Sequence, residues 1–293
     1  MPRIYPLFSS SSGNCTYVGT SAEGVLIDCG ASFTKIKKAL NLNGLSLDCV
    51  KAVFITHDHS DHVKGLKVLT KKTGLPVYSQ CDTLDVLYDM GLISSSSEDI
   101  KDFADIGSMR ISCFPTSHDT IQSCGYRVTF EDNVSCAVCT DLGYVSDEVR
   151  NGVKGCSSVL IESNYDVQML RNGGYPAYLK ARIRSDRGHL SNDDCGAFCA
   201  ELVESGTTRL ILGHLSQENN TPETAEYTVE AAIAQKGFQR NKDYLLSCAP
   251  VETAGGFVSF YIIIRTGSYR KSMTLFVFTV IFTYRNIVRN CSP

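Results

Sequence analysis

The chain has 293 residues, of which 43% are hydrophobic and 20% are charged, and its formal net charge is −3. These proportions are those of an ordinary globular protein, so they exclude an intrinsically disordered chain and a fibrous repeat. The slightly negative charge excludes a globally basic nucleic-acid binder, so any such partner must be met by a local basic patch.

The N-terminal segment favours β structure. Residues 1–12 contain one arginine and no apolar stretch of signal-peptide length, so we expect a cytoplasmic protein. Two short apolar runs, 15–18 and 25–28, are separated by a turn-like segment from Gly19 to Gly24. This pattern predicts two strands joined by a turn.

The next part of the chain predicts a helix and then a buried strand. In residues 32–40 the apolar side chains recur at helical spacing with lysines between them, which is typical of an amphipathic helix. The run 50–56 is apolar and rich in β-branched residues, and its length suits a buried strand. It stops at the polar cluster 57–62, which we therefore expect at the carboxyl end of a strand.

Strands and helices alternate further along the chain. Strands are predicted at 76–78, 109–114, 125–130, 134–139, 159–162 and 209–213. Helices are predicted at 83–90, 178–185, 192–205 and 222–235. Strands come first in runs and then alternate with helices, an order that favours an α/β protein of two helix-covered sheets over a doubly wound single sheet.

The last segment of the chain differs from the rest. From Tyr261 onward it is basic, and its apolar run 275–282 has eight residues, whereas a membrane-spanning helix needs about 20. We therefore predict one main domain over 1–260, no membrane span, and an atypical basic and apolar tail over 261–293. A surface-bound amphipathic segment, an extra strand and a poorly ordered appendage are the alternatives for this tail.

Thirteen cysteines are scattered through the chain. Their odd number and uneven spacing do not match the disulfide framework of a secreted domain, so we expect reduced thiols. Cys136 and Cys139 form a CxxC pair inside a predicted strand, and no second pair is present to complete four zinc ligands. We interpret this pair as core residues.

The most informative cluster is His57-Asp58-His59-Ser60-Asp61-His62, an HxHxDH pattern. Imidazole nitrogens and carboxylate oxygens suit borderline cations such as Zn²⁺ or Mn²⁺. Residues two apart in an extended chain point the same way, so His57 and His59 can converge on one ion. Asp61 and His62, one turn further on, can reach a neighbouring ion. The pattern predicts metal binding, against the alternative of solvated loop histidines.

The three other histidines stand in similar settings. His118 and His214 each follow a predicted strand, and His189 precedes a predicted helix. Loops at strand ends are where ligands and catalytic groups gather in layered folds, because the sheets hold them rigidly. We therefore count these histidines as further candidates for the site.

Two aspartates also follow predicted strands. Asp141 comes after the strand 134–139, and its two carboxylate oxygens suit a bridge between two cations, with an ordinary turn residue as the alternative. Asp28 ends the strand 25–28, where it is a candidate to orient a ligand histidine. A turn role for Asp28 is equally open.

In this order the residues resemble the metallo-β-lactamase superfamily, whose pattern is an early strand ending in Asp, then HxHxDH, a later His, a bridging Asp and a last His. The resemblance covers residues 3–260. It implies a four-layer αββα sandwich with two metal ions at one edge of the two sheets. The implied ligands form two sets that share Asp141 as a bridge: His57, His59 and His118 for one ion, and Asp61, His62 and His214 for the other.

Finer motifs are similar to the YycJ/WalJ subgroup, bacterial relatives of tRNase Z and of the β-CASP nucleases. These motifs are Ser10-Ser11-Ser12-Gly13-Asn14, residues 160–166, Gly188-His189-Leu190-Ser191-Asn192, residues 212–216 and Glu218-Asn219-Asn220. The subgroup is associated with nuclease activity on DNA, and the resemblance implies that Glu162 and His189 form a proton-relay pair. The chain has neither a β-CASP insertion nor a long tRNA-clamping arm, and its segment 249–253 departs from the subgroup.

The resemblance favours hydrolysis. Two cations that share a water lower its pKa, and the resulting hydroxide is the expected nucleophile on a phosphodiester. His189, assisted by Glu162, is the expected proton donor to the leaving group. The predicted catalytic residues are Asp61, Glu162 and His189.

Two segments offer candidate contacts to a nucleic-acid substrate. The basic run 180–187 would lie beside His189, and three of its side chains would share one helical face toward phosphates: Lys180, Arg184 and Arg187. A solvated helix face is the alternative. The second candidate is the set of backbone N–H groups of Ser12, Gly13 and Asn14, which could bind a phosphate. A tight turn is the alternative for these residues.

The sequence thus predicts a metal-dependent phosphodiesterase, specifically a DNA exonuclease. The alternative is a hydrolase of a small thioester, lactone or cyclic phosphodiester, which predicts a closed apolar pocket and no use of the basic run. A non-catalytic metal-binding regulator is the third hypothesis. The oligomeric state is left open.

Overall fold

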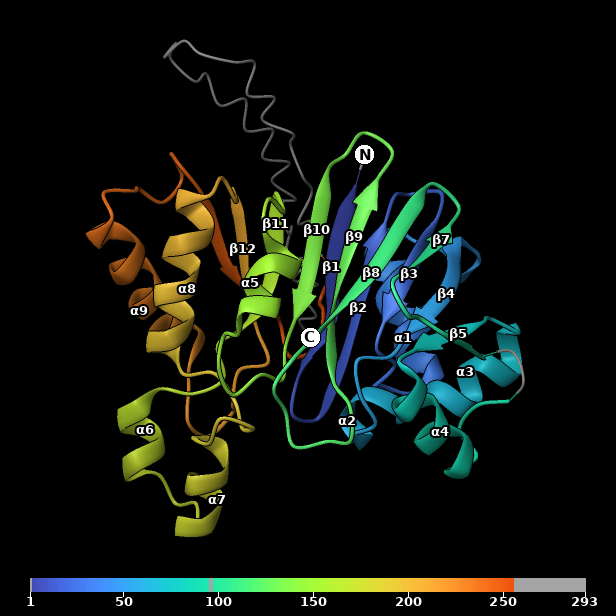
Figure 1. Ribbon diagram of the computed structural model, residues 1–293, viewed down its shortest axis with the longest axis horizontal. Coiled ribbons are helices and arrows are strands. Elements are labelled where there is room, and N and C mark those ends of the chain that lie inside the picture. Colours follow the sequence, from blue (N-terminus) through green and yellow to red (C-terminus); the bar gives the residue numbers. More distant parts are fainter. Residues whose placement is uncertain (1, 95–96, 256–293) are drawn as a thin grey trace, which may run out of the picture. The chain divides into compact units, whose positions relative to one another are not determined.

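Two β-sheets form the centre of the fold in the computed structural model, which describes residues 2–94 and 97–255 (Figure 1). The first sheet contains β1 (Arg3–Ser10), β2 (Gly13–Gly19), β3 (Gly24–Ile27), β4 (Val50–Phe54), β5 (Val77–Ser79) and β6 (Ser97–Asp99). The second contains β7 (Phe103–Ile106), β8 (Met109–Pro115), β9 (Cys124–Phe130), β10 (Ser135–Cys139), β11 (Ser158–Glu162), β12 (Arg209–Gly213) and β13 (Leu245–Cys248). In both sheets each strand pairs with the next strand of the chain, which is the simplest connectivity.

Each sheet is antiparallel on one side and parallel on the other. In the first sheet β1, β2 and β3 are antiparallel, and β3 to β6 are parallel. In the second sheet β7 to β10 are antiparallel, and β10 to β13 are parallel. Parallel neighbours need a crossover connection, which is usually helical. The parallel strands therefore end at the same edge of their sheet, where the loops after them meet.

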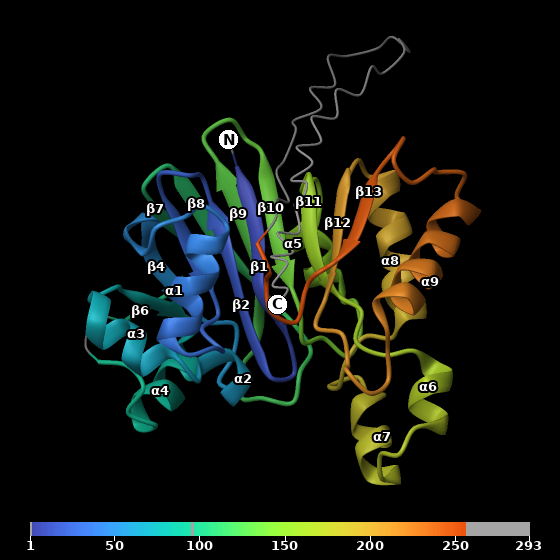
Figure 2. The same ribbon diagram turned by 180° about the vertical axis from the view of Figure 1, so that it is seen from behind.

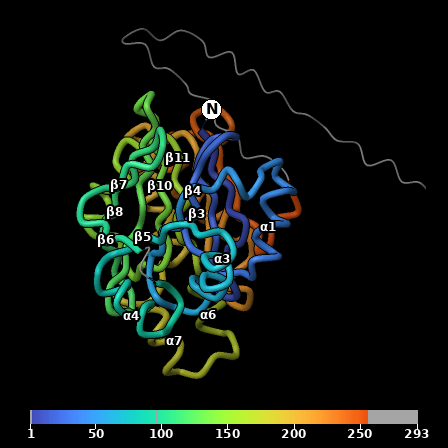
Figure 3. Tube along the Cα trace, turned by 90° about the vertical axis from the view of Figure 1, so that its right-hand side faces the viewer, coloured from blue at the N-terminus to red at the C-terminus, as the bar shows by residue number. Residues whose placement is uncertain are grey.

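Helices cover the outer face of each sheet. Those of the first half are α1 (Phe33–Leu42), α2 (Ser60–Val63), α3 (Leu66–Thr73) and α4 (Cys81–Asp89). Those of the second half are α5 (Asp147–Val153), α6 (Val167–Asn172), α7 (Ala177–Ile183), α8 (Asn192–Glu204) and α9 (Pro222–Gln235). Figures 1 and 2 show α1, α3 and α4 on one side of the sheets and α8 and α9 on the other. The α6–α7 pair lies beyond the strand ends, as the side view in Figure 3 also shows.

Three buried apolar clusters hold these layers together. One lies between the two sheets, where Phe54 of β4 and Tyr126 of β9 pack edge to face with their ring centroids 5.4 Å apart. The second joins the first sheet to α1, α3 and α4 and includes Leu69. The third joins the second sheet to α5, α8 and α9 and includes Phe198. Apolar side chains are thus buried on both faces of both sheets, and the predicted αββα sandwich is confirmed.

Most of the predicted elements are present with small shifts at their ends. The predicted turn joins β2 and β3, which pair antiparallel up to Gly19 and Gly24. The helix predicted at 32–40 is α1, and the Ser32 hydroxyl caps it by accepting a hydrogen bond from the Lys35 N–H. The sequence patterns did not predict β1, β6, β7, β13, α2, α3, α5 or α6.

The helix predicted at 178–185 is shorter than expected. It is α7, which ends at Ile183, so that Arg184 is its C-cap residue. The chain then turns back, and the His189 N–H donates to the Ile183 carbonyl oxygen at 2.9 Å. Arg187 therefore lies outside the helix, and the prediction of one shared helical face is wrong for that residue.

The cysteines behave as the sequence analysis predicted. Within the described residues every cysteine is a free thiol, and Cys136 and Cys139 are buried in β10. Among the same residues, no helix combines the length and the apolar character that crossing a membrane requires. The predicted tail, 261–293, lies outside the described residues, so its alternatives and the boundary at 260 stay predictions.

Candidate metal centre

The candidate site lies where strands of both sheets end. Most of the predicted site residues end a strand or follow one. In the first sheet Asp28 follows β3 and residues 57–62 follow β4. In the second sheet His118 follows β8, Asp141 follows β10, Glu162 ends β11 and His214 follows β12. Every histidine of the chain takes part in this convergence, since His189 lies within hydrogen-bonding distance of Glu162. The structure therefore brings together residues that are far apart in the sequence.

Three of these residues have an unusual backbone conformation. Asp28, Asp141 and His214 have φ angles of 64°, 60° and 54°, in the left-handed region that non-glycine residues rarely adopt. Each turns the chain sharply just beyond a strand. The His214 N–H donates to the Ser9 Oγ of β1 at 2.8 Å, which helps to hold that turn. Strain of this kind costs about 1–3 kcal/mol per residue and is characteristic of functional sites.

The HxHxDH loop is packed tightly against the segment that follows β3. The Cys29 N–H donates to the His62 carbonyl oxygen at 2.7 Å, and the Gly65 N–H donates to the Cys29 carbonyl oxygen at 2.8 Å. A Cβ atom on Gly30 would lie 1.6 Å from the Asp61 carbonyl oxygen, so only glycine allows this approach. The positions of Asp61 and His62 are therefore set by the backbone.

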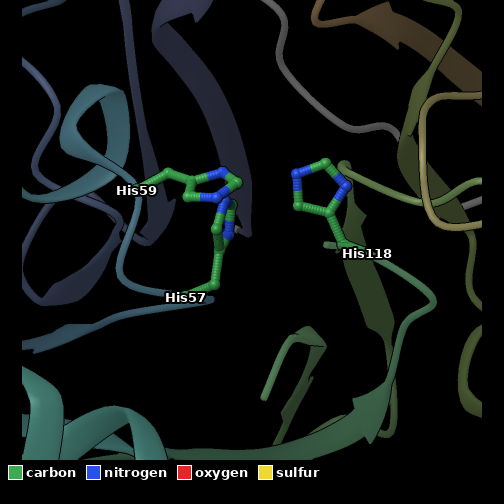
Figure 4. Close-up of side chains that lie close together, drawn as sticks. All are labelled: His57, His59 and His118. Atoms are coloured by element: carbon green, nitrogen blue, oxygen red, sulfur yellow. The ribbon is translucent and has the colours of Figure 1, made fainter. Parts of the chain in front are cut away.

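One set of candidate ligands consists of His57, His59 and His118 (Figure 4). One nitrogen of each ring lies within 4.8 Å of the corresponding nitrogens of the other two. In Figure 4, His57 and His59 stand on one loop and His118 faces them from the other side of a shared space. This arrangement matches the first ligand set that the sequence resemblance implied.

A second set consists of Asp61, His62 and His214, whose candidate ligand atoms also lie within 4.8 Å of one another. Asp141 lies between the two sets. Its Oδ2 is 3.3 Å from Nε2 of His62, and its Oδ1 is 3.7 Å from Nε2 of His118. The position of this carboxylate suits a bridge between two cations.

Hydrogen bonds orient three of the histidine rings. Nδ1 of His62 donates to Asp28 Oδ2 at 2.8 Å, Nδ1 of His118 donates to the Gly188 carbonyl oxygen at 3.0 Å, and Nδ1 of His214 donates to Glu162 Oε1 at 2.7 Å. A proton on Nδ1 leaves Nε2 to bind a cation, which is how proteins usually fix metal-binding histidines. Asp28 thus lies behind His62, as the sequence analysis expected.

Several buried polar atoms at the centre make no hydrogen bond. In the described part of the chain these include His57 Nε2, Asp141 Oδ2 and His214 Nε2. A buried polar group without a partner costs about 1–3 kcal/mol, so such atoms are uncommon in folded proteins. A divalent cation would be a partner for all three. The residues present therefore fit a metal centre.

Burial lowers the pKa values of the buried histidines in the site, whereas nearby carboxylates raise them. Burial, together with the neighbouring histidines, holds the pKa of His57 well below its usual range. Burial also lowers the pKa of His214, but the nearby carboxylates, Asp141 first, outweigh it and raise this pKa to about 10. In the same way Asp28 and Asp141 hold the pKa of His62 well above its usual range despite burial. Without a cation, protons on these rings balance the carboxylates, and a cation would take their place.

Glu162 connects the candidate ligands to His189. Its Oε1 accepts from Nδ1 of His189 at 2.9 Å and from Nδ1 of His214 at 2.7 Å. Its Oε2 accepts from the backbone N–H groups of Leu142 and Leu190 at 3.1 and 3.0 Å. Burial raises the pKa of Glu162, but the two histidines lower it further, so this fully buried group is a carboxylate. The His189 side chain, in contrast, is 20% exposed and can reach a substrate.

Other residues of the site were not expected from the sequence. The Thr56 hydroxyl donates to Asp28 at 3.0 Å and lies 3.0 Å from Nδ1 of His57. The Asn164 amide donates to the His214 carbonyl oxygen at 2.8 Å. Both are buried. The signals in the sequence that could have identified them are that Thr56 directly precedes the HxHxDH cluster and that Asn164 lies within the motif 160–166.

Residues 12–14 were predicted to offer backbone N–H groups to a substrate phosphate, and the structure shows other contacts for Ser12 and Asn14. Gly13 and Asn14 are the first residues of β2, and the Ser12 N–H donates to Ser10 Oγ at 3.2 Å, as expected of the tight-turn alternative. The side chain of Asn14 instead reaches the centre. Its Nδ2 donates to Asp61 Oδ2 at 3.2 Å and lies 3.0 Å from Nε2 of His62.

The predicted basic contacts are partly engaged within the chain. Lys180 Nζ donates to the carbonyl oxygens of Arg171 and Gly173 at 2.9 and 2.7 Å. Arg184 Nε lies 3.3 Å from the Lys180 carbonyl oxygen. Arg187 Nε donates to the carbonyl oxygen of His118 at 3.1 Å, so that Arg187 supports the loop of a candidate ligand. Phosphate binding by these side chains stays a prediction.

A four-layer sandwich with histidines and carboxylates at one end of its sheets defines a metal-dependent hydrolase of the metallo-β-lactamase fold. Residues 24–215 match the family model of the β-lactamase superfamily domain, and the chain belongs to this superfamily. It is 37% identical to exodeoxyribonuclease YycJ of Bacillus anthracis over 236 residues, which are 79% of this chain and 89% of that one. It is 36% identical to exodeoxyribonuclease WalJ of Streptococcus pneumoniae over 254 residues, which are 85% of this chain and 94% of that one.

A solved structure supports the fold independently. The metallo-β-lactamase fold protein YhfI from Bacillus subtilis aligns with a TM-score of 0.64 at 15% identity, covering 85% of this chain and 95% of its own. At this identity the likeness concerns the fold alone. Any comparison of activity therefore depends on the relatives that are similar in sequence.

Proposed function

We propose that the protein is a phosphodiesterase that uses two divalent cations, Zn²⁺ or Mn²⁺, and degrades DNA from an end. The relatives named exodeoxyribonucleases support this activity, because they are 37% and 36% identical over most of both chains. The observation that carries the proposal is the contact of Glu162 with both His189 and His214. It joins a candidate proton donor to a candidate metal ligand.

Two groups of side chains would hold the cations. The first is His57, His59 and His118, the second is Asp61, His62 and His214, and Asp141 lies between them. When bound, the cations would supply an activated water and neutralise charge on the phosphodiester oxygens. Asp61 suits a ligand because it is a carboxylate: burial raises its pKa, but the nearby rings of His214 and His62 lower it further. Asn14 would hold the same carboxylate in place.

His189 would donate the proton that the leaving oxygen needs. Its Nδ1 is bound to Glu162, so Nε2 is the atom left for the substrate. The Glu162 carboxylate would keep the ring in this orientation. Since Leu142 and Leu190 fix the second carboxylate oxygen, Glu162 is not free to rotate away. A positioned general acid contributes about 10²–10⁴-fold to the rate.

Degradation of labelled DNA tests this proposal. Wild-type protein supplied with Mn²⁺ or Zn²⁺ is expected to release mononucleotides from single- and double-stranded DNA, and Asp61→Ala and His189→Ala are expected to be severely impaired. Asp85→Ala, which changes an exposed aspartate of α4, is the matched control and should cleave as wild type does. The proposal fails if wild-type protein leaves DNA intact under these conditions but hydrolyses a thioester or a lactone.

A further inference from the structure

A small helical arm stands at the same end of the sheets as the candidate metal centre. We define the arm as residues 167–187, which contain α6 and α7 (Figures 1 and 2). Leu170 is the only buried residue of α6, and α7 has none. Apolar packing therefore does not explain why this part of the chain extends beyond the strands.

The arm is basic although the chain as a whole is acidic. The whole chain has a net charge of −3, whereas the arm holds one acidic residue, Asp186, and five basic residues. The basic residues are Arg171, Lys180, Arg182, Arg184 and Arg187. Four of the five basic side chains are exposed, and Lys180 is half-buried. The local excess of positive charge suits a polyanion.

The arm is fastened directly to the loop that carries His118. Arg182 forms an ion pair with Asp119, the residue after His118. Arg187 donates to the His118 carbonyl oxygen at 3.1 Å. The Ser117 hydroxyl donates to the Asp186 carbonyl oxygen. A ligand that lies along the arm would therefore reach the candidate metal centre.

Two tyrosines beside this attachment are exposed. Tyr178, in α7, is 75% exposed, and it precedes Arg182 by four residues, so both lie on the same helical face about 6 Å apart along the axis. Tyr144 is 48% exposed. It follows Gly143, where a Cβ atom would lie 2.3 Å from the backbone of Asp186, so Tyr144 stands next to the base of the arm.

We infer that the arm binds a single strand of DNA at the entrance to the site, with unpaired bases stacked on Tyr178 and Tyr144. This inference rests on the proposed function. Positive charge alone would bind duplex and single strand, since both carry phosphates. An exposed aromatic ring adds affinity only for a base whose face is free, because bases inside a duplex are already stacked. The arm therefore favours single-stranded ends.

Fluorescence anisotropy with a labelled oligonucleotide and its duplex tests the inference. The binding assays use the full chain in a His189→Ala background, which is expected to slow cleavage and leaves both ligand sets intact. Tyr178→Ala is expected to bind the single strand about tenfold more weakly, the size of one lost base stack, while its duplex affinity changes less than about twofold. Tyr178→Phe retains the ring and should bind as the background protein does.

Tyr227→Ala is the matched control, since Tyr227 is 77% exposed on α9, outside the arm. It should leave both affinities unchanged. The inference is overturned if Tyr178→Ala binds the single strand as tightly as the background protein, or if it weakens single strand and duplex equally. If wild-type protein cleaves DNA in either case, the proposed function stands without the arm. If wild-type protein neither binds nor cleaves DNA, both fail.

Discussion

Glu162 Oε1 lies 2.9 Å from Nδ1 of His189, and the glutamate is completely buried whereas the histidine side chain is 20% exposed. The buried partner is therefore fixed and the exposed partner can meet a substrate. Because the same Oε1 also accepts from His214, the charge of this carboxylate is shared between a candidate proton donor and a candidate metal ligand.

Replacing His189 with alanine should affect the rate and spare metal binding. We expect DNA cleavage to slow by about 10²–10⁴-fold, because the general acid is lost. Metal content, measured by mass spectrometry of the purified protein, should match that of wild type, since His189 belongs to neither ligand set. A variant that loses its metal together with its activity would instead identify His189 as a ligand.

Metal affinity should rise with pH. The pKa of His214 is raised to about 10 by carboxylates that outweigh burial, so its ring is protonated at neutral pH in the metal-free protein. Nε2 must lose its proton before it binds a cation, so binding releases protons and tightens by up to about tenfold per pH unit for each proton released. Calorimetry in buffers of different ionisation heat measures this release. Equal heats in all buffers would contradict the expectation.

Thr56→Val should weaken metal binding without unfolding the protein. The Thr56 hydroxyl is buried and bonded to Asp28, which in turn orients His62. Loss of such a supporting hydrogen bond typically lowers metal affinity by about 10–100-fold. Competition with a chromophoric chelator measures the change. Thr56→Ser retains the hydroxyl and should bind metal as wild type does; equal weakening in both variants would point to packing instead.

Gly30→Ala should destabilise the fold strongly. The added Cβ would lie 1.6 Å from the Asp61 carbonyl oxygen, so the HxHxDH loop must move. We expect a loss of about 3 kcal/mol or more, which lowers the Tm by about 10 °C in a domain of this size. Gly174→Ala is the control, because a Cβ there meets nothing within 4 Å. Thermal unfolding of the two variants gives the answer, and equal Tm values would show that the loop adapts freely.

Local patterns in the sequence explain why much of the fold and the site could be predicted. The HxHxDH cluster lies within six residues, and the Ser32 cap and the periodic apolar residues after it define α1. β1 was missed because its last residues are serines, which favour turns, although Ser9 and Ser10 are buried in the sheet.

Contacts between distant parts of the chain explain what could not be predicted. Ser9 and His214 are 205 residues apart, yet the hydroxyl of one accepts from the backbone of the other. The end of α7 depends likewise on its surroundings, because the chain must return from Ile183 to place His189 beside Glu162. A Cβ on Gly188 would lie 2.2 Å from the Ile183 carbonyl oxygen, so this return requires glycine.

The most direct test is to titrate Mn²⁺ into the metal-free protein and to measure the rate of mononucleotide release from end-labelled DNA. A two-cation phosphodiesterase should reach its plateau at two equivalents of metal per chain. Asp141→Asn, which removes the charge between the two ligand sets, should stay far below that plateau. A plateau at one equivalent, or intact DNA at every metal concentration, would contradict the proposed two-cation mechanism.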